Sequence, residues 1–335
     1  MKKLIAIAVT LALLLTMVIS APVAANTDIH VSPGGDIQAA VNGATWGDTI
    51  ILNDGTFSNY TTVTVGTSGI TIKAANPGLA ILDGGGGPAF RLTDGLKDVT
   101  FEGLVIKNRS GSRGGGIEAW DMTTSNIKVL NNQFLDNDYN GILVGSEGGF
   151  VHSNWMVNGN TVDGNGFAGI ELTNAQNSKI MNNTVVNSGF AGIVVQARNT
   201  VADSGSVAIN AVKVLRNTVD NAIYGIYIFS FTGHPTNFTP ITGASSLLTN
   251  TTVNDNTITD SGNAGVIFWA YNSEAMAENA TINDNAISNA TYGVRVLEAG
   301  GGGAGTVKKV KVMNNSYTNC TTDVQDTGTG TKIRP

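Results

Sequence analysis

One short motif recurs seven times along the chain, each time with asparagine at its fourth position. The seven asparagines are Asn132, Asn160, Asn183, Asn217, Asn256, Asn285 and Asn315. Successive asparagines lie 23 to 39 residues apart, and six of them are followed, eight or nine residues later, by glycine and then isoleucine or valine. Such a repeat, with variation confined to the segments between fixed parts, is typical of a solenoid whose units pack on their neighbours.

Each copy of the motif contains short runs in which apolar and polar residues alternate. In the first copy Val129 precedes the asparagine, Phe134 follows it and Ile142 follows the glycine, all in the same phase. Alternating, β-branched runs of this length predict strands. Three strands per unit, stacked about 4.8 Å apart, predict an all-β fold: a single-stranded, right-handed parallel β-helix with three strands per rung.

The asparagine column has a structural explanation at the bend between two strands. Backbone groups at a bend point away from the sheet ladder and would be buried without partners. A stacked amide side chain can bond to those groups and to the asparagines of neighbouring rungs. The sequence therefore predicts an asparagine ladder inside the solenoid.

The segments outside the repeats predict the domain boundaries. Residues 1–25 have the pattern of a secretory signal peptide, with Lys2 and Lys3 ahead of an apolar run that ends in small residues. Residues 26–47 are expected to cap the N-terminal end with a short helix whose N-cap is Asp36. Residues 48–325 are the predicted β-helix, and residues 326–335 are expected to be a loose tail.

Cleavage of the signal segment predicts a secreted or cell-surface protein without stable membrane insertion, although retention of the segment as an anchor is an open alternative. The segments 197–210, 230–250, 270–279 and 300–305 vary most between copies and are predicted insertions. Insertions on one side of a solenoid usually frame its binding face.

Three stretches before the repeats have the pattern of opening rungs: residues 47–57, 69–78 and 99–108. With the asparagine repeats, they make the chain resemble the pectin-lyase-like superfamily of secreted parallel β-helix proteins, over about residues 28–325. The resemblance implies the fold, but that family holds lyases, hydrolases, epimerases, adhesins and inert surface proteins. Its catalytic signatures, Gly-His-Gly, Arg-Ile-Lys, Asp-Pro-His and the stacked aspartates of the calcium site, do not occur here, so it transfers no active-site residue.

The residues two and four positions after each glycine should point outward. Polysaccharide-active members of the resembled family place their groove on this face. The predicted substrate-binding residues are Trp120, Thr173, Gln196, Arg198, Tyr227, Phe229 and Trp269. Aromatic rings stack on sugars, and Trp120 and Trp269 are expected on one column, six rungs apart. In the alternative interpretation, segment 230–250 covers Tyr227 and Phe229, which are then ordinary packing residues.

Glu118 and Glu171 fall in one outward column, two rungs apart, which predicts about 9.5 Å between their Cα atoms. Inverting glycosidases separate their two carboxyl groups by about 6.5–9.5 Å to admit a water molecule. These two residues, with Arg91, are therefore the candidate catalytic residues. The alternative is that Arg91, one rung away, simply pairs with Glu118.

The sequence gives little indication of a cofactor. Asp255 and Asp284 stack on adjacent rungs and are a candidate calcium site, but two carboxylates alone make a poor one, so no metal and no cofactor are predicted. The formal net charge of −6 argues against nucleic acid as a partner. Cys320 is the single cysteine, which excludes a disulfide within the chain.

Two functions from different classes are consistent with these residues. The first is a non-catalytic secreted or cell-surface protein whose stiff solenoid presents a carbohydrate-recognition face to a polysaccharide or cell-surface glycan. The second is a polysaccharide lyase, glycoside hydrolase or epimerase that acts in the groove outside the glycine strands. The absence of the family's catalytic signatures favours the first.

Overall fold

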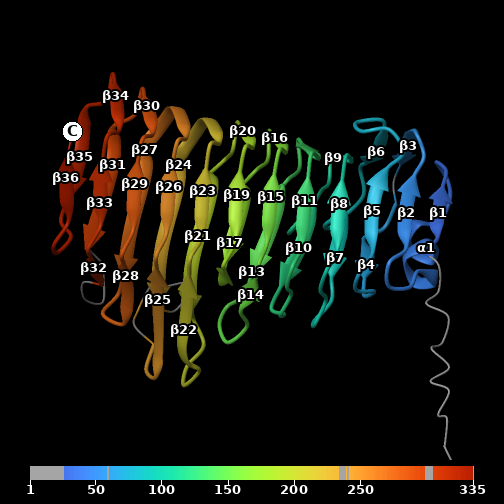
Figure 1. Cartoon of the computed structure of the whole chain (residues 1–335), viewed down its shortest axis with the longest axis horizontal. Helices are drawn as coiled ribbons and strands as arrows, with labels where there is room; N and C mark the ends of the chain where they lie inside the picture. The colour runs from blue at the N-terminus through green and yellow to red at the C-terminus, as the bar shows by residue number, and fades with distance from the viewer. Residues whose placement is uncertain (1–25, 59, 234–238, 240, 299–304, 335) are drawn as a thin grey trace, which may run out of the picture.

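The computed structural model describes residues 26–58, 60–233, 239, 241–298 and 305–334. The predicted signal segment, residues 1–25, and most of the glycine run at 300–305 lie outside these residues. The chain coils into an elongated solenoid, with its rungs side by side along the long axis (Figure 1). Every strand pairing is parallel, as the repeat predicts.

The strands ahead of each asparagine turn stack into one sheet along the whole described solenoid. Its strands are β1 (Asp28–Val31), β2 (Thr49–Leu52), β5 (Thr71–Ala74), β8 (Thr100–Glu102), β11 (Lys128–Leu130), β15 (Met156–Asn158), β19 (Lys179–Met181), β23 (Lys213–Leu215), β26 (Thr252–Asn254), β29 (Thr281–Asn283), β33 (Lys311–Met313) and β36 (Lys332–Arg334).

The strands after the asparagine form a second column: β3 (Gly55–Ser58), β6 (Ala80–Asp83), β9 (Val105–Lys107), β12 (Gln133–Leu135), β16 (Thr161–Asp163), β20 (Thr184–Val186), β30 (Ala286–Ser288) and β34 (Ser316–Thr318). Those that carry the glycine position form a third: β4 (Val63–Val65), β7 (Phe90–Leu92), β10 (Ile117–Trp120), β13 (Ile142–Gly145), β17 (Ala168–Thr173), β21 (Ala191–Asn199), β31 (Tyr292–Glu298) and β35 (Thr322–Asp326). Two long strands, β24 (Thr218–Thr232) and β27 (Thr257–Tyr271), run through both columns.

The interior of the solenoid is one continuous apolar core that extends from Val31 to Val312. Val129, Phe134 and Ile142, the three residues of one predicted phase, are all fully buried in it. Because side chains of a strand alternate between its two faces, the period-two pattern places the β-branched residues inside and leaves the intervening residues on the outer surface.

The seven motif asparagines form a ladder through the core. The backbone N–H of Asn132 donates to Asn160 Oδ1 at 2.9 Å, and that of Asn160 donates to Asn183 Oδ1 at 2.9 Å. Each amide also reaches the rung before it, as when Asn183 Nδ2 donates to the Val157 carbonyl at 3.0 Å. The ladder starts at Leu104, whose backbone N–H donates to Asn132 Oδ1 at 3.0 Å.

A second use of asparagine was not anticipated from the sequence. Most rungs turn three times through a residue with left-handed backbone angles, at φ near +55°, and asparagine and aspartate tolerate this conformation best after glycine. The acidic and amide residues at these turns include Asp98, Asn126, Asn154, Asn177, Asn131, Asn182, Asp255, Asp284, Asn108, Asp136, Asn187 and Asp260. The abundance of asparagine therefore reflects these exposed turns as well as the buried ladder.

Arg109 is fully buried in the N-terminal part of the solenoid, where it binds backbone carbonyls instead of a carboxylate. Its five N–H donors reach the carbonyl oxygens of Tyr60, Gly84, Gly86, Gly87 and Pro88. Gly85, at φ +92°, is required there because a Cβ would lie 2.3 Å from Arg109 Nη1. The guanidinium thus uses its full donor capacity to hold the glycine-rich loop.

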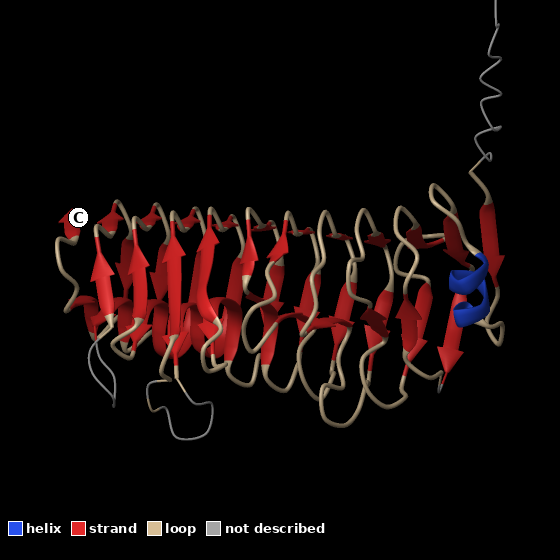
Figure 2. Cartoon of the chain, turned by 90° about the horizontal axis from the view of Figure 1, so that it is seen from below, coloured by secondary structure: helices blue, strands red, loops and turns tan. Residues whose placement is uncertain are grey.

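The N-terminal end is covered as expected by helix α1 (Ile37–Gly43), with Ile37 and Val41 buried against the first rung (Figure 2). Asp36 is its N-cap, and the carboxylate accepts a hydrogen bond from the Ala39 N–H at 2.9 Å. The predicted boundary of the β-helix at residue 48 was wrong, because β1 already pairs with β2 and belongs to the first sheet. No helix in the described ranges is long and apolar enough to cross a membrane.

A second boundary from the sequence was also wrong. The segment 326–335 is not a loose tail, because β36 continues the first sheet by pairing with β33. Three of the predicted insertions contain strands of a fourth, short sheet: β22 (Gly205–Asn210), β25 (Ala244–Thr249) and β28 (Ala275–Glu278). This sheet continues with β32 (Thr306–Lys308), which comes directly after the segment 300–305. On earlier rungs, β14 (His152–Ser153) pairs with β18 (Ala175–Gln176).

The ladder makes a prediction about stability. Replacing Asn183 with leucine removes the acceptor of the Asn160 N–H and leaves that buried group without a partner, which should lower the free energy of unfolding by about 1–3 kcal/mol. Replacing the neighbouring, exposed Thr184 with alanine should change it little. Urea denaturation of both variants measures the difference, and equal losses would refute the structural role of the ladder.

Candidate functional site

The outer face of the third column carries one large cavity, of about 630 Å³. We call it the aromatic groove. Its lining residues are Arg113, Trp120, Tyr139, Leu143, Glu147, Phe167, Glu171, Phe190, Val194, Gln196, Arg198, Tyr227, Phe229, Phe231, Trp269 and Tyr271. They come from six successive rungs, from the segment before β10 to the end of β27, so the groove runs along the solenoid axis.

The strand register brings the predicted outward columns together. Glu171 pairs with Val194, Val194 with Tyr227, and Tyr227 with Ile267, while Thr173, Gln196, Phe229 and Trp269 follow one another in the second column. Trp120 and Trp269 line the same groove but are five strand steps apart, not six, which corresponds to about 24 Å. Trp120 lies against Gly145 on the next rung, where an added Cβ would be 2.8 Å from its ring.

One wall of the groove is a stack of aromatic rings that sequence reasoning missed. Tyr139 and Phe167 stack with centroids 5.2 Å apart and an interplanar angle of 8°, and Phe167 and Phe190 stack at 5.0 Å and 7°. Each ring comes two residues before the glycine of its rung, at Gly141, Gly169 and Gly192. This constant offset from the glycine could have predicted the stack, because residues at the same position of successive rungs lie directly above one another in a parallel β-helix.

The C-terminal end of the groove is a second cluster of rings, which belongs to a hydrophobic cluster separate from the solenoid core. We call Tyr227, Phe229, Phe231, Trp269 and Tyr271 the ring cluster. Tyr227 and Phe229 are each 8% exposed and pack on one another with centroids 5.3 Å apart. They are therefore mostly buried, by one another and by neighbouring rings such as Trp269, yet they still line the groove. Part of the segment 230–250, which the alternative interpretation placed over them, lies outside the described residues.

Glu171 is a buried carboxyl group on the floor of the groove, with 5% of its surface exposed. Its Oε2 accepts a hydrogen bond from Asn140 Nδ2 at 2.9 Å, and its Oε1 lies 3.0 Å from Thr173 Oγ1. Thr173 Oγ1 is also 3.3 Å from Gln196 Oε1. Removal from water raises the pKa of the Glu171 carboxyl, and the hydrogen bonds from Asn140 and Thr173 only partly offset this effect.

The same contacts fit a protonated Glu171. The Thr173 hydroxyl has one proton but two oxygen neighbours, Glu171 Oε1 and Gln196 Oε1. If Glu171 carries a proton and donates it to Thr173, then Thr173 can donate its own proton to Gln196, and every oxygen in the chain has a partner. The hydrogen bonds therefore hold the Glu171 carboxyl group in a fixed orientation on the groove floor and are compatible with its protonated form.

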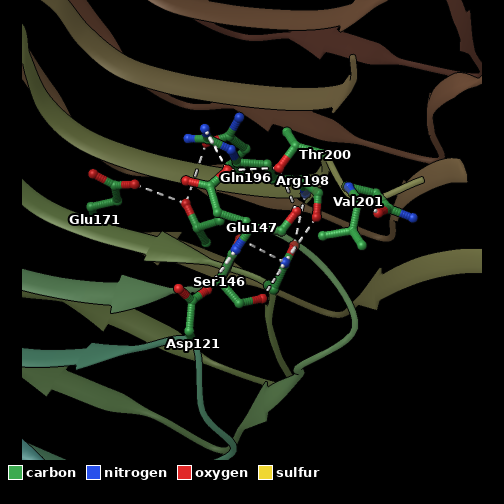
Figure 3. A network of polar contacts seen from close by, with 11 residues as sticks. Asp121, Ser146, Glu147, Glu171, Gln196, Arg198, Thr200 and Val201 are labelled. Atoms are coloured by element: carbon green, nitrogen blue, oxygen red, sulfur yellow. Dashed lines mark hydrogen bonds and ion pairs between the residues drawn. The ribbon is translucent and has the colours of Figure 1, made fainter. Parts of the chain in front are cut away.

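Beside Glu171, an ion pair forms the polar rim of the groove (Figure 3). Arg198 Nη2 lies 2.8 Å from Glu147 Oε2, which also accepts a hydrogen bond from Thr200 Oγ1 at 2.6 Å. The Glu147 N–H donates to Asp121 Oδ1 at 2.9 Å, which fixes the loop after β13. Glu147 and Asp121 were not found from the sequence, because they lie in the connections after β13 and β10, outside the repeated positions.

Two donors on lining residues are buried without a hydrogen-bond partner among the described residues. They are the indole Nε1 of Trp120 and the Nε of Arg198. The ring of Trp120 is held in place by the guanidinium of Arg113, whose carbon lies 4.9 Å from the ring centroid. Buried donors without partners are rare in native proteins, and oxygen atoms of a ligand or of ordered water would satisfy them.

The predicted catalytic pair is not assembled in the groove. Glu118 Oε1 lies 3.4 Å from Arg91 Nε and 3.4 Å from Arg113 Nη1, and neither Glu118 nor Arg91 lines the cavity. Leu143 stands between Glu118 and Glu171 in the column. The predicted pairing of Glu118 with Arg91 is confirmed. Thr173 is fully buried beneath Glu171, so it can act only through its neighbours.

The candidate calcium ligands occupy turn positions. Asp255 and Asp284 both have left-handed backbone angles, and each carboxylate accepts a hydrogen bond from the preceding asparagine, Asn254 or Asn283. Within the described residues, no group of three or more histidine, cysteine, aspartate or glutamate side chains is arranged to hold a metal ion.

Residues 61–239 match the model of a protein family described as the right handed beta helix region. Among solved structures, the chain is similar to the A-module of a mannuronan C-5 epimerase from Azotobacter vinelandii, at 13% identity and a TM-score of 0.53, over 89% of this chain and 92% of that one. The Yersinia enterocolitica family 28 exopolygalacturonase gives 11% identity and a TM-score of 0.56, over 92% of this chain and 78% of that one.

A third similar structure is the catalytic domain of an alpha-1,3-glucanase in complex with nigerose, at 14% identity and a TM-score of 0.51, over 91% of this chain and 69% of that one. At these identities the likeness extends to the fold. No curated protein matches the sequence of this chain.

Burial of Glu171 predicts a pH dependence of stability. Because its folded-state pKa is raised, its stabilising contribution is complete below the unfolded value near 4.5 and is lost as pH rises through the folded value. Glu171→Gln keeps the same hydrogen bonds without ionising. We therefore expect the wild type to lose stability relative to this variant in thermal melts as the pH is raised above 4.5. Glu274→Gln, at an exposed site, should follow the wild type; parallel curves for all three proteins would contradict a neutral, buried Glu171.

Proposed function

The chain belongs to the right-handed β-helix region family, and from that premise we propose that it binds a carbohydrate in its aromatic groove. One observation carries this proposal: stacking surfaces and buried donors without partners line the same cavity. Trp120 and the stacked rings of Phe167 and Phe190 supply apolar faces, and Trp120 Nε1 and Arg198 Nε supply hydrogen-bond donors. Sugars combine apolar C–H faces with hydroxyl oxygens, so they need both kinds of group close together.

The solved structures with this fold support the proposal that the ligand is a carbohydrate. The epimerase is named for mannuronan, the exopolygalacturonase acts on a polysaccharide by its name, and the glucanase was solved with nigerose. The length of the groove suits an extended glycan that runs along the solenoid axis. Gln196 lies between the two ends and offers an amide to the ligand.

A second candidate function is a chemical reaction on the bound glycan, and one observation favours it. Glu171 is an acid on the floor of the groove whose hydrogen bonds match its protonated form. A neutral carboxyl group in an apolar site is the usual form of a general acid. Lyase, hydrolase and epimerase chemistry all remain in this class, whereas a recognition protein would use Glu171 only as a hydrogen-bond donor.

We further propose that the protein acts outside the cell or at its surface. The charged start and apolar run of residues 1–25 carry this part of the proposal, because they match a secretory signal. Cell fractionation and N-terminal sequencing of the protein expressed in its host would test it. A cytoplasmic protein that retains Lys2 and Lys3 would contradict it.

The binding proposal predicts the effect of removing one ring. A glycan array should identify an oligosaccharide that binds, and Trp120→Ala should weaken that binding by about 1 kcal/mol or more in calorimetry, because an aromatic anchor is lost. Trp46→Ala is the matched control, because Trp46 is 59% exposed and lies by the N-terminal end, outside the groove. Equal binding by both variants, at wild-type thermal stability, would refute the groove as the binding site.

Glu171→Gln separates the two candidate functions on the same ligand. A recognition protein should keep most of its affinity, because glutamine preserves the hydrogen bonds to Asn140 and Thr173. An enzyme should keep binding but lose the appearance of new reducing ends, unsaturated ends or epimerised residues during incubation. The wild type incubated in parallel decides between them.

A further inference from the structure

The charged side chains that line the aromatic groove all lie toward its N-terminal end. Arg113 precedes β10, Glu147 follows β13, Glu171 belongs to β17 and Arg198 to β21. In the described part of the chain, the next two strands, β24 and β27, contribute no charged lining residue. The charged lining residues are therefore confined to the rungs from β10 to β21, and the rungs of β24 and β27 line the groove with aromatic rings.

The apolar end consists of the ring cluster. Phe229 is at its centre, with ring centroids 5.2 Å from Trp269, 5.5 Å from Phe231 and 6.3 Å from Tyr271. Ile267 and Leu297 pack into the same hydrophobic cluster on the outer face of the sheet. The solvent-facing side of a strand is ordinarily polar. An apolar cluster that lines a cavity on this side therefore indicates that the cavity binds a ligand with an apolar part.

A sugar ring fits this end poorly. A phenylalanine ring can stack on the C–H face of a sugar, but it has no atom that accepts or donates a hydrogen bond. The polar atoms of the ring cluster are the hydroxyls of Tyr227 and Tyr271 and the indole N–H of Trp269. A sugar hydroxyl that lies over Phe229 and Phe231, out of reach of those three groups, would lose water without gaining a partner, which disfavours binding. An apolar group placed there instead gains affinity in proportion to the apolar area that it buries.

We propose that the natural ligand is an amphiphilic glycoside, with its sugar at the Glu171–Arg198 end of the groove and an apolar aglycone at the ring cluster. This inference rests on the proposed carbohydrate binding and adds the chemical class of the ligand. The polar end has the groups that a sugar needs, namely the Gln196 amide and the buried donors Trp120 Nε1 and Arg198 Nε. Because the two ends of the groove differ in this way, the ligand binds in one orientation along the solenoid axis.

The test uses matched glycosides on the full chain. The sugar of the strongest oligosaccharide in a glycan array is prepared as its methyl, phenyl and hexyl glycosides, and binding is measured by calorimetry. We expect the phenyl or the hexyl glycoside to bind at least tenfold more tightly than the methyl glycoside, and the better of the two identifies an aromatic or an aliphatic aglycone. Equal affinities for all three would overturn the aglycone site while leaving carbohydrate binding intact.

Variants at the ring cluster test whether the apolar part of the glycoside binds there. Trp269→Ala and Tyr271→Ala should each reduce the ratio of the affinity for the apolar glycoside to that for the methyl glycoside to less than threefold. Trp46→Ala should keep the full advantage, and thermal melts confirm that each variant is folded. An advantage that persists in both ring-cluster variants would overturn the proposal, because the apolar group would then bind elsewhere. If neither glycosides nor oligosaccharides bind the wild type, the proposed function fails together with this inference.

Discussion

The structure depends on the need to satisfy buried backbone groups wherever a strand bends into the next. A parallel β-helix makes such bends in every rung, and water cannot reach the inner ones. The asparagine ladder meets this need, because each side chain accepts a hydrogen bond from the backbone N–H of the neighbouring rung and donates one to a strand carbonyl, as Asn183 does with Asn160 and Val157. Once the bends are fixed in register, the apolar residues of each strand stack on those of the next, and the core becomes continuous.

Those parts of the fold that repeat could be predicted from the sequence. The phase of Val129 and Phe134 and the spacing of the asparagines predict strands, their inward faces and the ladder, because stacked rungs impose one environment on equivalent positions. The fourth sheet could not be predicted, since strands such as β32 pair only where variable segments meet and share no motif. The end of the chain was misjudged for a related reason: β36 lacks the asparagine turn, but it follows the open edge of β33.

The same distinction applies to the candidate site. Trp120, Gln196 and Trp269 could be placed on one face because they share a repeated position, and Phe167 and Phe190 could have been found by their constant offset from the glycine. Glu147 could not, because it lies in the connection after β13, outside the repeated positions, and contacts Arg198 only in the folded chain. Glu118 and Glu171 share a column yet differ in surroundings: the segment before β10 brings Arg113 to Glu118, whereas Glu171 is enclosed beside Asn140.

Buried polar side chains in this protein differ in whether other groups of the protein complete their hydrogen bonds. Arg109 is fully buried and all five of its donors are bonded to carbonyl oxygens of the chain, so the protein itself completes its hydrogen bonding. Among the charged and indole groups of the described residues, the buried polar atoms without a protein partner are Glu118 Oε2, Trp120 Nε1 and Arg198 Nε. Trp120 and Arg198 line the aromatic groove, whereas Glu118 does not line it and contacts Arg91 and Arg113. Other buried atoms without a partner, such as the Tyr60 hydroxyl and Ser188 Oγ, belong to residues outside the groove, so the lack of a protein partner does not by itself mark a binding site. What distinguishes Trp120 Nε1 and Arg198 Nε is that both belong to residues that line one cavity, where the proposed ligand would bond to them.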